Sequence, residues 1–190
     1  FYKNAAVQEL DDGFTVVLDG RAVKTPAKQS LVIATEKLAE AVASEWRAQE
    51  DEIRHTSMPM MRYVCTTLDR VSPMRADVIK ETAKYSETDL LCYRATQPPE
   101  LAQRQNEAWQ PLLNWAVDQY GATLRTTTKL TPIAQDGASL KRLHAALGAE
   151  NDLTLTGLHI ATAASGSVIV ALAMLERKID AEQAWTISHI

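Results

Sequence analysis

The chain of 190 residues has few of the residues that mark several protein classes. Its two cysteines, Cys65 and Cys92, cannot build a disulfide framework, and their wide spacing is not that of a redox or zinc motif. Only seven glycines and seven prolines are present, which excludes a fibrous or disordered chain. We therefore expect one compact domain, or two small domains sharing a core, with both thiols reduced and partly buried.

The chain also lacks an excess of positive charge. Twenty lysines and arginines stand against 24 aspartates and glutamates, for a formal net charge of −4. Neither half of the chain is basic, whereas a nucleic-acid-binding domain usually carries clustered lysine and arginine. We expect no nucleic-acid partner.

No local signature of catalysis is present. The sequence contains no phosphate-binding glycine loop, no dinucleotide fingerprint, no Gly-x-Ser-x-Gly elbow, no His-Glu-x-x-His and no calcium loop. The four histidines are scattered: His55, His144, His159 and His189. We therefore predict a protein that is not an enzyme and has no cofactor or metal. The alternative is a small soluble enzyme in which Cys65 or Cys92 meets a histidine and a carboxylate in space.

The first 34 residues are typical of β-strands. Asp19-Gly20 separates the β-prone run 14–18 from the run 21–24, and this pair favours a tight hairpin because both of its positions need positive φ. A second Asp-Gly pair, Asp12-Gly13, precedes the first run. The pattern predicts an antiparallel meander.

From Thr35 onward the hydrophobic period becomes helical. Leu38, Val42 and Trp46 recur every four residues, and Thr35 can cap the helix. Ser57-Met58-Pro59, Ser72-Pro73 and Pro98-Pro99 predict three further helix starts, the last helix running to Gly121 with a kink or restart at Pro111. Further helices are expected over residues 139–147, 152–164 and 167–178 and from Asp180, whereas residues 89–95 and 123–130 are expected to be extended. The fold class is α+β: a small N-terminal antiparallel β domain followed by a larger helical domain.

Residues 153–175 contain no Asp, Glu, Lys or Arg, a run long enough to span a bilayer. The segment Ser165-Gly166-Ser167 divides this run into two shorter pieces. We interpret it as a buried helix pair, with a membrane span as the alternative. No secretory signal or transit peptide is visible, which predicts a bacterial cytoplasmic protein, or a mitochondrial matrix protein if a leader has been removed.

Two features are suited to binding another protein. Glu45 and the run Glu50-Asp51-Glu52 form either a solvated helix end or a docking face for a basic partner. Trp109 and Trp115 lie about 240° apart around a helix, so both cannot face the same core. One of them is a candidate anchor for a partner protein.

Several segments together resemble a known family. They include Leu-Asp-Gly-Arg-Ala-Val-Lys-Thr-Pro at 18–26, Ser-Glu-Trp at 44–46 with Gln49, and Asp-Leu-Leu-Cys-Tyr-Arg-Ala at 89–95. Trp109 and Trp115, Ser-Gly-Ser at 165–167 and Ala-Trp at 184–185 also match. In this order, over nearly the whole chain, they are similar to the ATP-twelve chaperones, assembly factors for the catalytic sector of the F-type ATP synthase.

The resemblance implies a two-part fold, here an N-terminal β domain at 1–34 and a mainly helical domain at 35–190, without the family's usual C-terminal tail. It also implies a function: a monomer that binds the unassembled alpha subunit, prevents its aggregation, and yields it to the beta subunit without hydrolysing ATP.

Few residue roles follow from the resemblance. Arg21, Lys24, Glu45 and Arg94 are candidates for contact with the client or for an ion pair joining the domains. Gly20, Pro26 and Trp46 are expected to be structural, with Gly20 in the turn, Trp46 in the core and Glu45 as its exposed neighbour.

Overall fold

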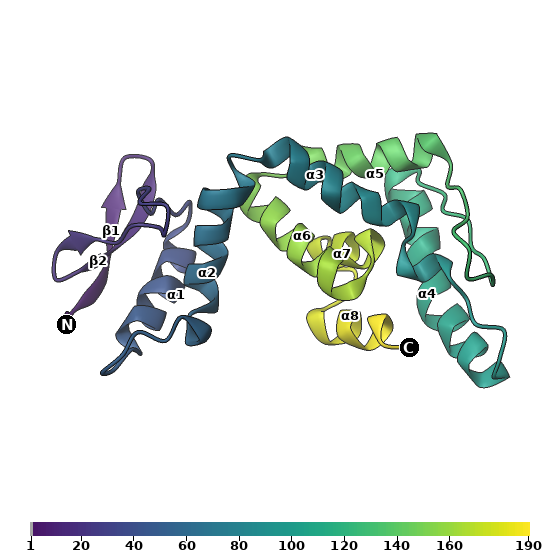
Figure 1. Cartoon of the computed structure of the whole chain (residues 1–190), viewed down its shortest axis with the longest axis horizontal. Coiled ribbons are helices and arrows are strands. Elements are labelled where there is room, and N and C mark those ends of the chain that lie inside the picture. Colours follow the sequence, from purple (N-terminus) through teal and green to yellow (C-terminus); the bar gives the residue numbers. More distant parts are fainter. Residues whose placement is uncertain (1) are drawn as a thin grey trace. The chain divides into compact units, whose positions relative to one another are not determined.

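The computed structural model describes residues 2–190 (Figure 1). The chain divides into two compact units, here called unit 1 (Phe1–Arg75) and unit 2 (Ala76–Ile190). Residue 34, where strand-forming sequence gives way to helix-forming sequence, lies inside unit 1, because the first helix after it packs on the sheet and the second packs on the first. A small antiparallel sheet followed by helices confirms the α+β class.

The strands are β1 (Ala5–Leu10), β2 (Gly13–Leu18) and β3 (Arg21–Ala22). The α-helices are α1 (Glu36–Arg47), α2 (Pro59–Thr66), α3 (Arg75–Lys84), α4 (Pro99–Tyr120), α5 (Gly137–Ala149), α6 (Asp152–Ser165), α7 (Val168–Leu175) and α8 (Ala181–Ser188). Short 3-10 turns lie at η1 (His55–Ser57), η3 (Tyr85–Glu87) and η4 (Leu90–Cys92), and a π-helical turn η2 (Thr67–Val71) follows α2.

The sheet of unit 1 follows the predicted hairpin pattern. Its strands lie in the order β1-β2-β3, all antiparallel, with Leu18 paired to Arg21. Asp19 and Gly20 have φ values of 48° and 81°, as a two-residue hairpin turn requires. The predicted turn is confirmed, and β3 begins directly after it at Arg21.

Helix α1 covers the sheet and closes the core of unit 1. The Thr35 side chain accepts a hydrogen bond from the Leu38 amide, as predicted. The buried residues of the helix alternate with charged ones at helical spacing, so that one face packs on the strands. The core joins strand, loop and helix residues: Val16, Leu31, Ile33, Ala39, Val42, Ala43, Trp46 and Met58.

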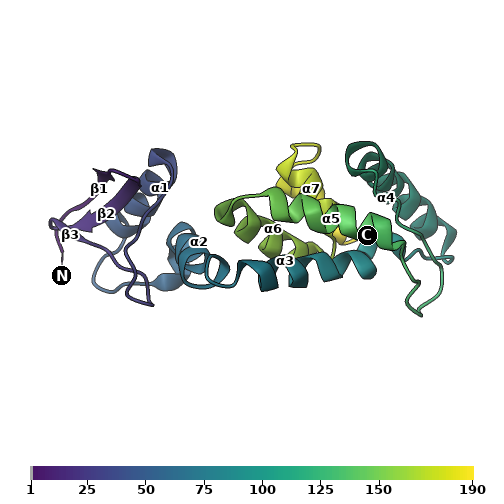
Figure 2. The same ribbon diagram turned by 90° about the horizontal axis from the view of Figure 1, so that it is seen from above.

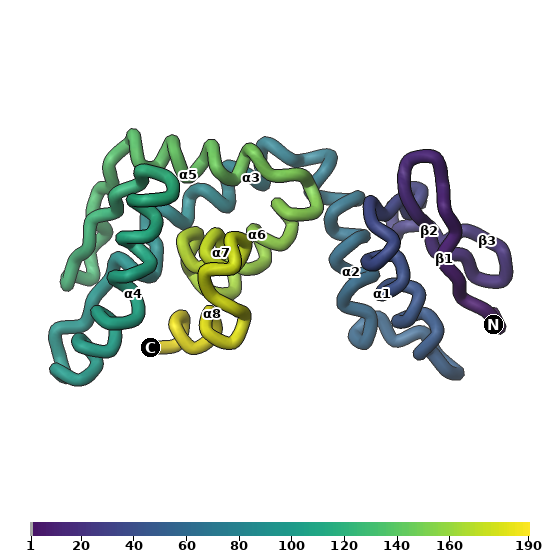
Figure 3. Tube along the Cα trace, turned by 180° about the vertical axis from the view of Figure 1, so that it is seen from behind, coloured from purple at the N-terminus to yellow at the C-terminus, as the bar shows by residue number. Residues whose placement is uncertain are grey.

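Helix α7 forms the centre of unit 2. Every residue from Val168 to Ala173 is buried, because α6, α4 and α8 all pack against this short helix. The tube view follows the chain from α6 through α7 into α8 (Figure 3). Residues 153–175 do form a helix pair, as interpreted, but only α7 is buried, whereas α6 is largely half-buried and Ile160 is exposed. Among residues 2–190, none of the helices combines the length and apolar character that crossing a membrane requires.

Two segments of unit 2 differ from the expectation of extended structure. Residues 89–95 contain the 3-10 turn η4, and only Tyr93 makes a β-bridge, to Thr127. Residues 123–130 form no strand beyond that bridge. The chain turns at η4 because the Asp89 carboxylate accepts the Leu91 amide, which an extended strand could not present to it.

Helix α4 begins at Pro99 and ends at Tyr120, and Gly121 stops it with a left-handed φ of 65°, as predicted. Of the two outcomes expected at Pro111, a kink or a restart, the restart does not occur: the helix is continuous through it. Pro111 is exposed, so its ring meets solvent instead of a packed neighbour.

Candidate functional site

The predicted site residues fall into both units, and each group has its own setting. Gly20, Arg21, Lys24, Pro26, Glu45 and Trp46 belong to unit 1, and Arg94 belongs to unit 2. The two groups are therefore described separately.

Arg21 and Lys24 are exposed, on β3 and just beyond it. The segment after Lys24 turns back at Pro26, where the Lys28 amide donates to the Thr25 carbonyl at 2.8 Å. This turn is fixed from outside by a residue that the sequence did not point to. The carboxylate of Asp69, in η2, accepts the Thr25 hydroxyl at 2.6 Å and the Ala27 amide at 3.0 Å.

The result is two exposed basic side chains, of which Lys24 stands on backbone held by hydrogen bonds from two sides. Thr25 is buried beneath the turn, so the backbone that carries Lys24 is held by β-pairing on one side and by Asp69 on the other. The Arg21 and Lys24 side chains extend into solvent. Such an arrangement can bind an anionic or polar partner surface with little loss of backbone entropy.

Glu45 differs from the expected exposed neighbour. It is half-buried, and its two carboxylate oxygens accept the amides of Met60 at 2.7 Å and Met61 at 2.8 Å. These amides lie in the first turn of α2, where backbone donors have no partner within the helix. Glu45 is thus a cap that α1 supplies to α2.

Trp46 is buried in the core of unit 1, as predicted. Its ring meets Tyr2 edge-on, with centroids 5.8 Å apart, and the Tyr2 hydroxyl donates to the Trp46 carbonyl at 2.5 Å. The neighbouring motif residues Glu45 and Trp46 therefore have different roles. Glu45 caps the start of α2, and Trp46 fills the core of unit 1.

Arg94 is fixed by contacts within unit 2. Its guanidinium donates to the carbonyls of Leu91 at 2.8 Å and Gln105 at 3.1 Å, and lies 5.3 Å from the ring centre of Trp109. Burial lowers the pKa of this guanidinium. All these partners belong to unit 2, and they join η4 to α4.

Asp89 is the first residue of the family segment 89–95, which also contains Arg94. It is fully buried and accepts the amides of Leu91 at 3.1 Å and Ile169 at 3.3 Å, so it caps the start of α7. Burial raises its pKa to about 6, although hydrogen bonds from Ser167 and nearby amides act in the opposite direction. In the sequence, the contact between Asp89 and the start of α7 was indicated only by the family segment Ser-Gly-Ser at 165–167.

The thiols do not form the catalytic site of the alternative hypothesis. Cys92 is fully buried, and burial together with the Asp89 charge raises its pKa to about 12. Cys65 is half-buried, and burial together with Asp69 raises its pKa to about 11. A nucleophilic cysteine needs the opposite shift. His159 is half-buried, and its Nδ1 lies 2.9 Å from the Thr82 hydroxyl. Residues 2–190 contain no cluster of metal-binding side chains.

Helix α8 carries an exposed aromatic residue that the sequence analysis did not select. Trp185 is 65% exposed, and its ring lies 3.9 Å from that of His189. A small cavity of about 130 Å³ adjoins it, lined mainly by alanines of α6 and α8. Ile160 of α6 is also exposed. Trp109 is buried and Trp115 half-buried, so the stronger candidate for an aromatic anchor is Trp185.

The geometry thus consists of exposed basic side chains, capped helices and an exposed indole, with two thiols whose pKa values are raised. The family model described as ATP12 chaperone protein matches residues 1–117. The crystal structure of Atp12 from Paracoccus denitrificans is 36% identical, with a TM-score of 0.96, and the match covers 100% of this chain and 81% of that one. A candidate chaperone of Agrobacterium tumefaciens, Atu1473, is 34% identical with a TM-score of 0.94, over 100% of this chain and 71% of its own.

These likenesses define a chaperone and not an enzyme. The chain belongs to the ATP12 chaperone family, which confirms the resemblance found in its motifs.

Proposed function

We propose that this protein binds the unassembled alpha subunit of the F-type ATP synthase, keeps it from aggregating and releases it when the beta subunit takes its place. The main support is that the likeness to Atp12 extends over the full length of this chain at 36% identity. The family segments at 18–26 and 89–95 lie in different units, and each is fixed by carboxylates of its own unit.

The physical basis is the protection of an apolar surface. A subunit made before its partner exposes the interface that the partner will later bury, and such patches aggregate. The holder needs an apolar contact of its own that can be given up. Trp185, exposed beside a small apolar cavity, offers a contact of this kind, because an aromatic anchor contributes much binding energy over a small area.

Unit 1 is proposed to contribute polar contacts through Arg21 and Lys24. Both are exposed, whereas Glu45 and Arg94 already have partners within their own units. We propose that the protein acts as a monomer in a bacterial cytoplasm, or in a mitochondrial matrix if a leader has been removed. We propose no nucleic-acid partner, since the net charge is −4.

Co-purification with the alpha subunit tests the function. The purified chain should retain the isolated alpha subunit and lose it when the beta subunit is added. Failure to retain it, while unrelated unfolded proteins are held equally well, would contradict the proposal. No ATP turnover is expected in either case.

The variant Trp185→Ala tests the proposed anchor. We expect roughly a tenfold loss of affinity or more for the alpha subunit, as for truncation of an interface aromatic. Leu130→Ala is the matched control, because Leu130 is fully exposed in a loop of the same unit. Equal affinities for the two variants would remove Trp185 from the interface.

Hydrogen exchange maps the proposed contacts. Amides near Arg21 and Lys24, and those of α8 near Trp185, should exchange more slowly in the complex. Protection in only one unit would show that the other does not contact the client.

A further inference from the structure

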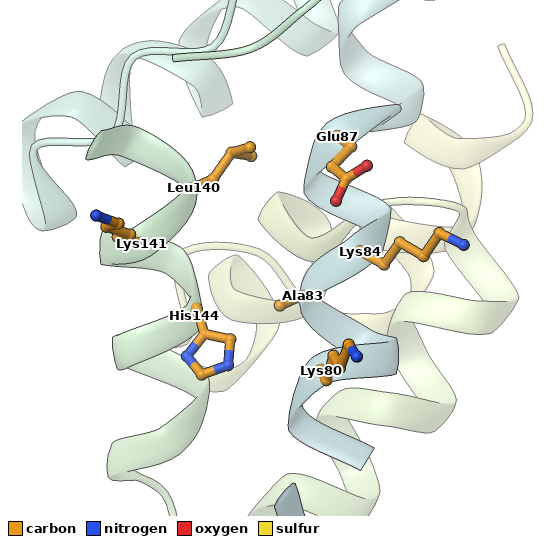
Figure 4. A pocket seen from close by; sticks show the side chains of 7 residues that line it. All are labelled: Lys80, Ala83, Lys84, Glu87, Leu140, Lys141 and His144. Atoms are coloured by element: carbon orange, nitrogen blue, oxygen red, sulfur yellow. The ribbon is translucent and has the colours of Figure 1, made fainter. Parts of the chain in front are cut away.

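A groove runs between α3 and α5 in unit 2 (Figure 4). The two helices lie side by side (Figure 2), and a Cβ placed at Gly148 would lie 3.9 Å from Cδ1 of Ile79. Farther along, the small Ala83 faces the opposite helix, so a groove of about 390 Å³ opens there. Its lining residues are Lys80, Ala83, Lys84, Glu87, Leu140, Lys141 and His144.

The charge of the groove is opposite to that of the whole chain. The groove lining contains three lysines and one glutamate, whereas the protein as a whole has a net charge of −4. Lys80 and Lys84 come from α3, and Lys141 comes from α5. The Lys84 and Lys141 side chains extend outward, each away from the opposite helix, so these two ammonium groups lie on the outer sides of the two rims (Figure 4). Within residues 2–190, none of the three forms an ion pair with a carboxylate of this chain. The positive charge is therefore available to a partner.

The base of the groove is apolar. Ala83 is buried and Leu140 half-buried between the rims, and the lysine stems add further hydrocarbon surface. The backbone amides here lie in helix interiors, where they bond within the helix. A site for a small phosphate usually offers free amides or an arginine fork, and the groove lining has neither.

These features fit a protein segment better than a small anion. Spaced carboxylates could pair with lysines on both rims while an apolar side chain of the same segment contacts Ala83 and Leu140. We propose that this groove docks an acidic, amphipathic segment of the client, and this inference rests on the proposed function. The groove and Trp185 would then bind the same client, the groove by charge complementarity and Trp185 as an aromatic anchor.

The test is the double variant Lys80→Glu with Lys141→Glu. These residues stand on opposite helices, and Lys80 lies inside α3, away from its last turn, so the reversal does not oppose the helix dipole there. The control, Lys129→Glu with Lys178→Glu, changes net charge equally at exposed lysines of unit 2 outside the groove. Circular dichroism is used to check that both variants fold like the unaltered chain.

Binding to purified alpha subunit is measured at about 50 mM and about 300 mM salt, where screening differs strongly. We expect the groove variant to bind about tenfold more weakly at low salt and to lose most of its salt dependence. The control should stay within about twofold of the unaltered chain. A photo-crosslinking residue at position 140 should capture an alpha-subunit peptide containing Asp or Glu.

The outcomes separate the two proposals. If the unaltered chain does not bind the alpha subunit, both the proposed function and the groove's assigned partner fail. If it binds and the groove variant binds equally well, or the crosslinked peptide lacks carboxylates, only the groove inference fails. If polyuridylate binds the unaltered chain and not the groove variant, while client affinity is unchanged, the groove is a polyanion site and the inference is wrong.

Discussion

The two units stabilise a helix start in the same way but in different surroundings. In unit 1, Glu45 accepts two amides at the start of α2 and remains half-buried. In unit 2, Asp89 accepts amides of η4 and of α7 and is fully buried. The hydrogen bonds are alike, so the difference lies in access to water.

Burial gives the second cap a property that the first does not share. A carboxylate removed from water is costly to ionise, and the pKa of Asp89 is raised to about 6. Its removal should also cost more, because the amides it caps cannot turn to solvent. The contrast predicts a graded series of effects, which mutations can test.

The largest effect is expected for Asp89→Ala. The change strands the Leu91 and Ile169 amides in the core and leaves a cavity, so we expect unit 2 to lose about 4 kcal/mol of stability. Urea unfolding followed by circular dichroism measures this loss. A loss no larger than that of a surface cap would show that water reaches the site.

The second prediction concerns pH. The folded state retains a proton on Asp89 up to about pH 6, whereas the ordinary value in an unfolded chain is 3.8. Because the folded state binds more protons in this window, the Asp89 contribution to stability falls as pH rises from about 4 to 6. The stability of the protein relative to Asp89→Asn should therefore fall by about 3 kcal/mol across it and stay constant above. A flat difference would mean an unshifted carboxyl group.

A smaller effect is expected for Glu45→Ala in unit 1. Water can replace part of the lost cap at Met60 and Met61, so we expect a loss of about 2 kcal/mol. Glu45→Gln retains one acceptor oxygen and should lose about half as much. Thermal unfolding at pH 7 compares the three chains, and equal loss in both variants would assign the effect to charge alone.

The smallest effect is expected for Asp69→Asn. The acceptor to the Thr25 hydroxyl can survive this change while the charge is removed, so we expect a loss of about 1 kcal/mol. The Asp69 charge also contributes to the raised pKa of Cys65, so the Cys65 thiol should be alkylated faster in the variant at pH 8.5. An unchanged alkylation rate would separate the two groups.

Structure encoded by neighbouring residues was accessible from the sequence. The turn at Asp19-Gly20, the cap at Thr35 and the capping box from Asp180 to Gln183 each depend on residues within four positions. Both hydrogen bonds of this capping box are present.

The contacts that the sequence did not predict have a common feature: the two partners lie far apart in the chain. Asp89 meets Ile169, 80 positions later, and Glu45 meets Met60, 15 positions later. Periodicity reports which face of a segment is apolar, and it carries no information on which remote amide a carboxylate will meet. The same limit left Asp69 and the exposed Trp185 unselected.

One contact in unit 2 also determines where the chain can tolerate substitution. The indole nitrogen of Trp109 donates to the carbonyl of Ile187 at 2.9 Å and so fastens the end of α8 to α4. The acceptor is a main-chain atom that every amino acid supplies, whereas no other side chain offers the same donor at position 109. Substitution at position 187 should therefore leave this hydrogen bond in place, whereas substitution at position 109 should remove it.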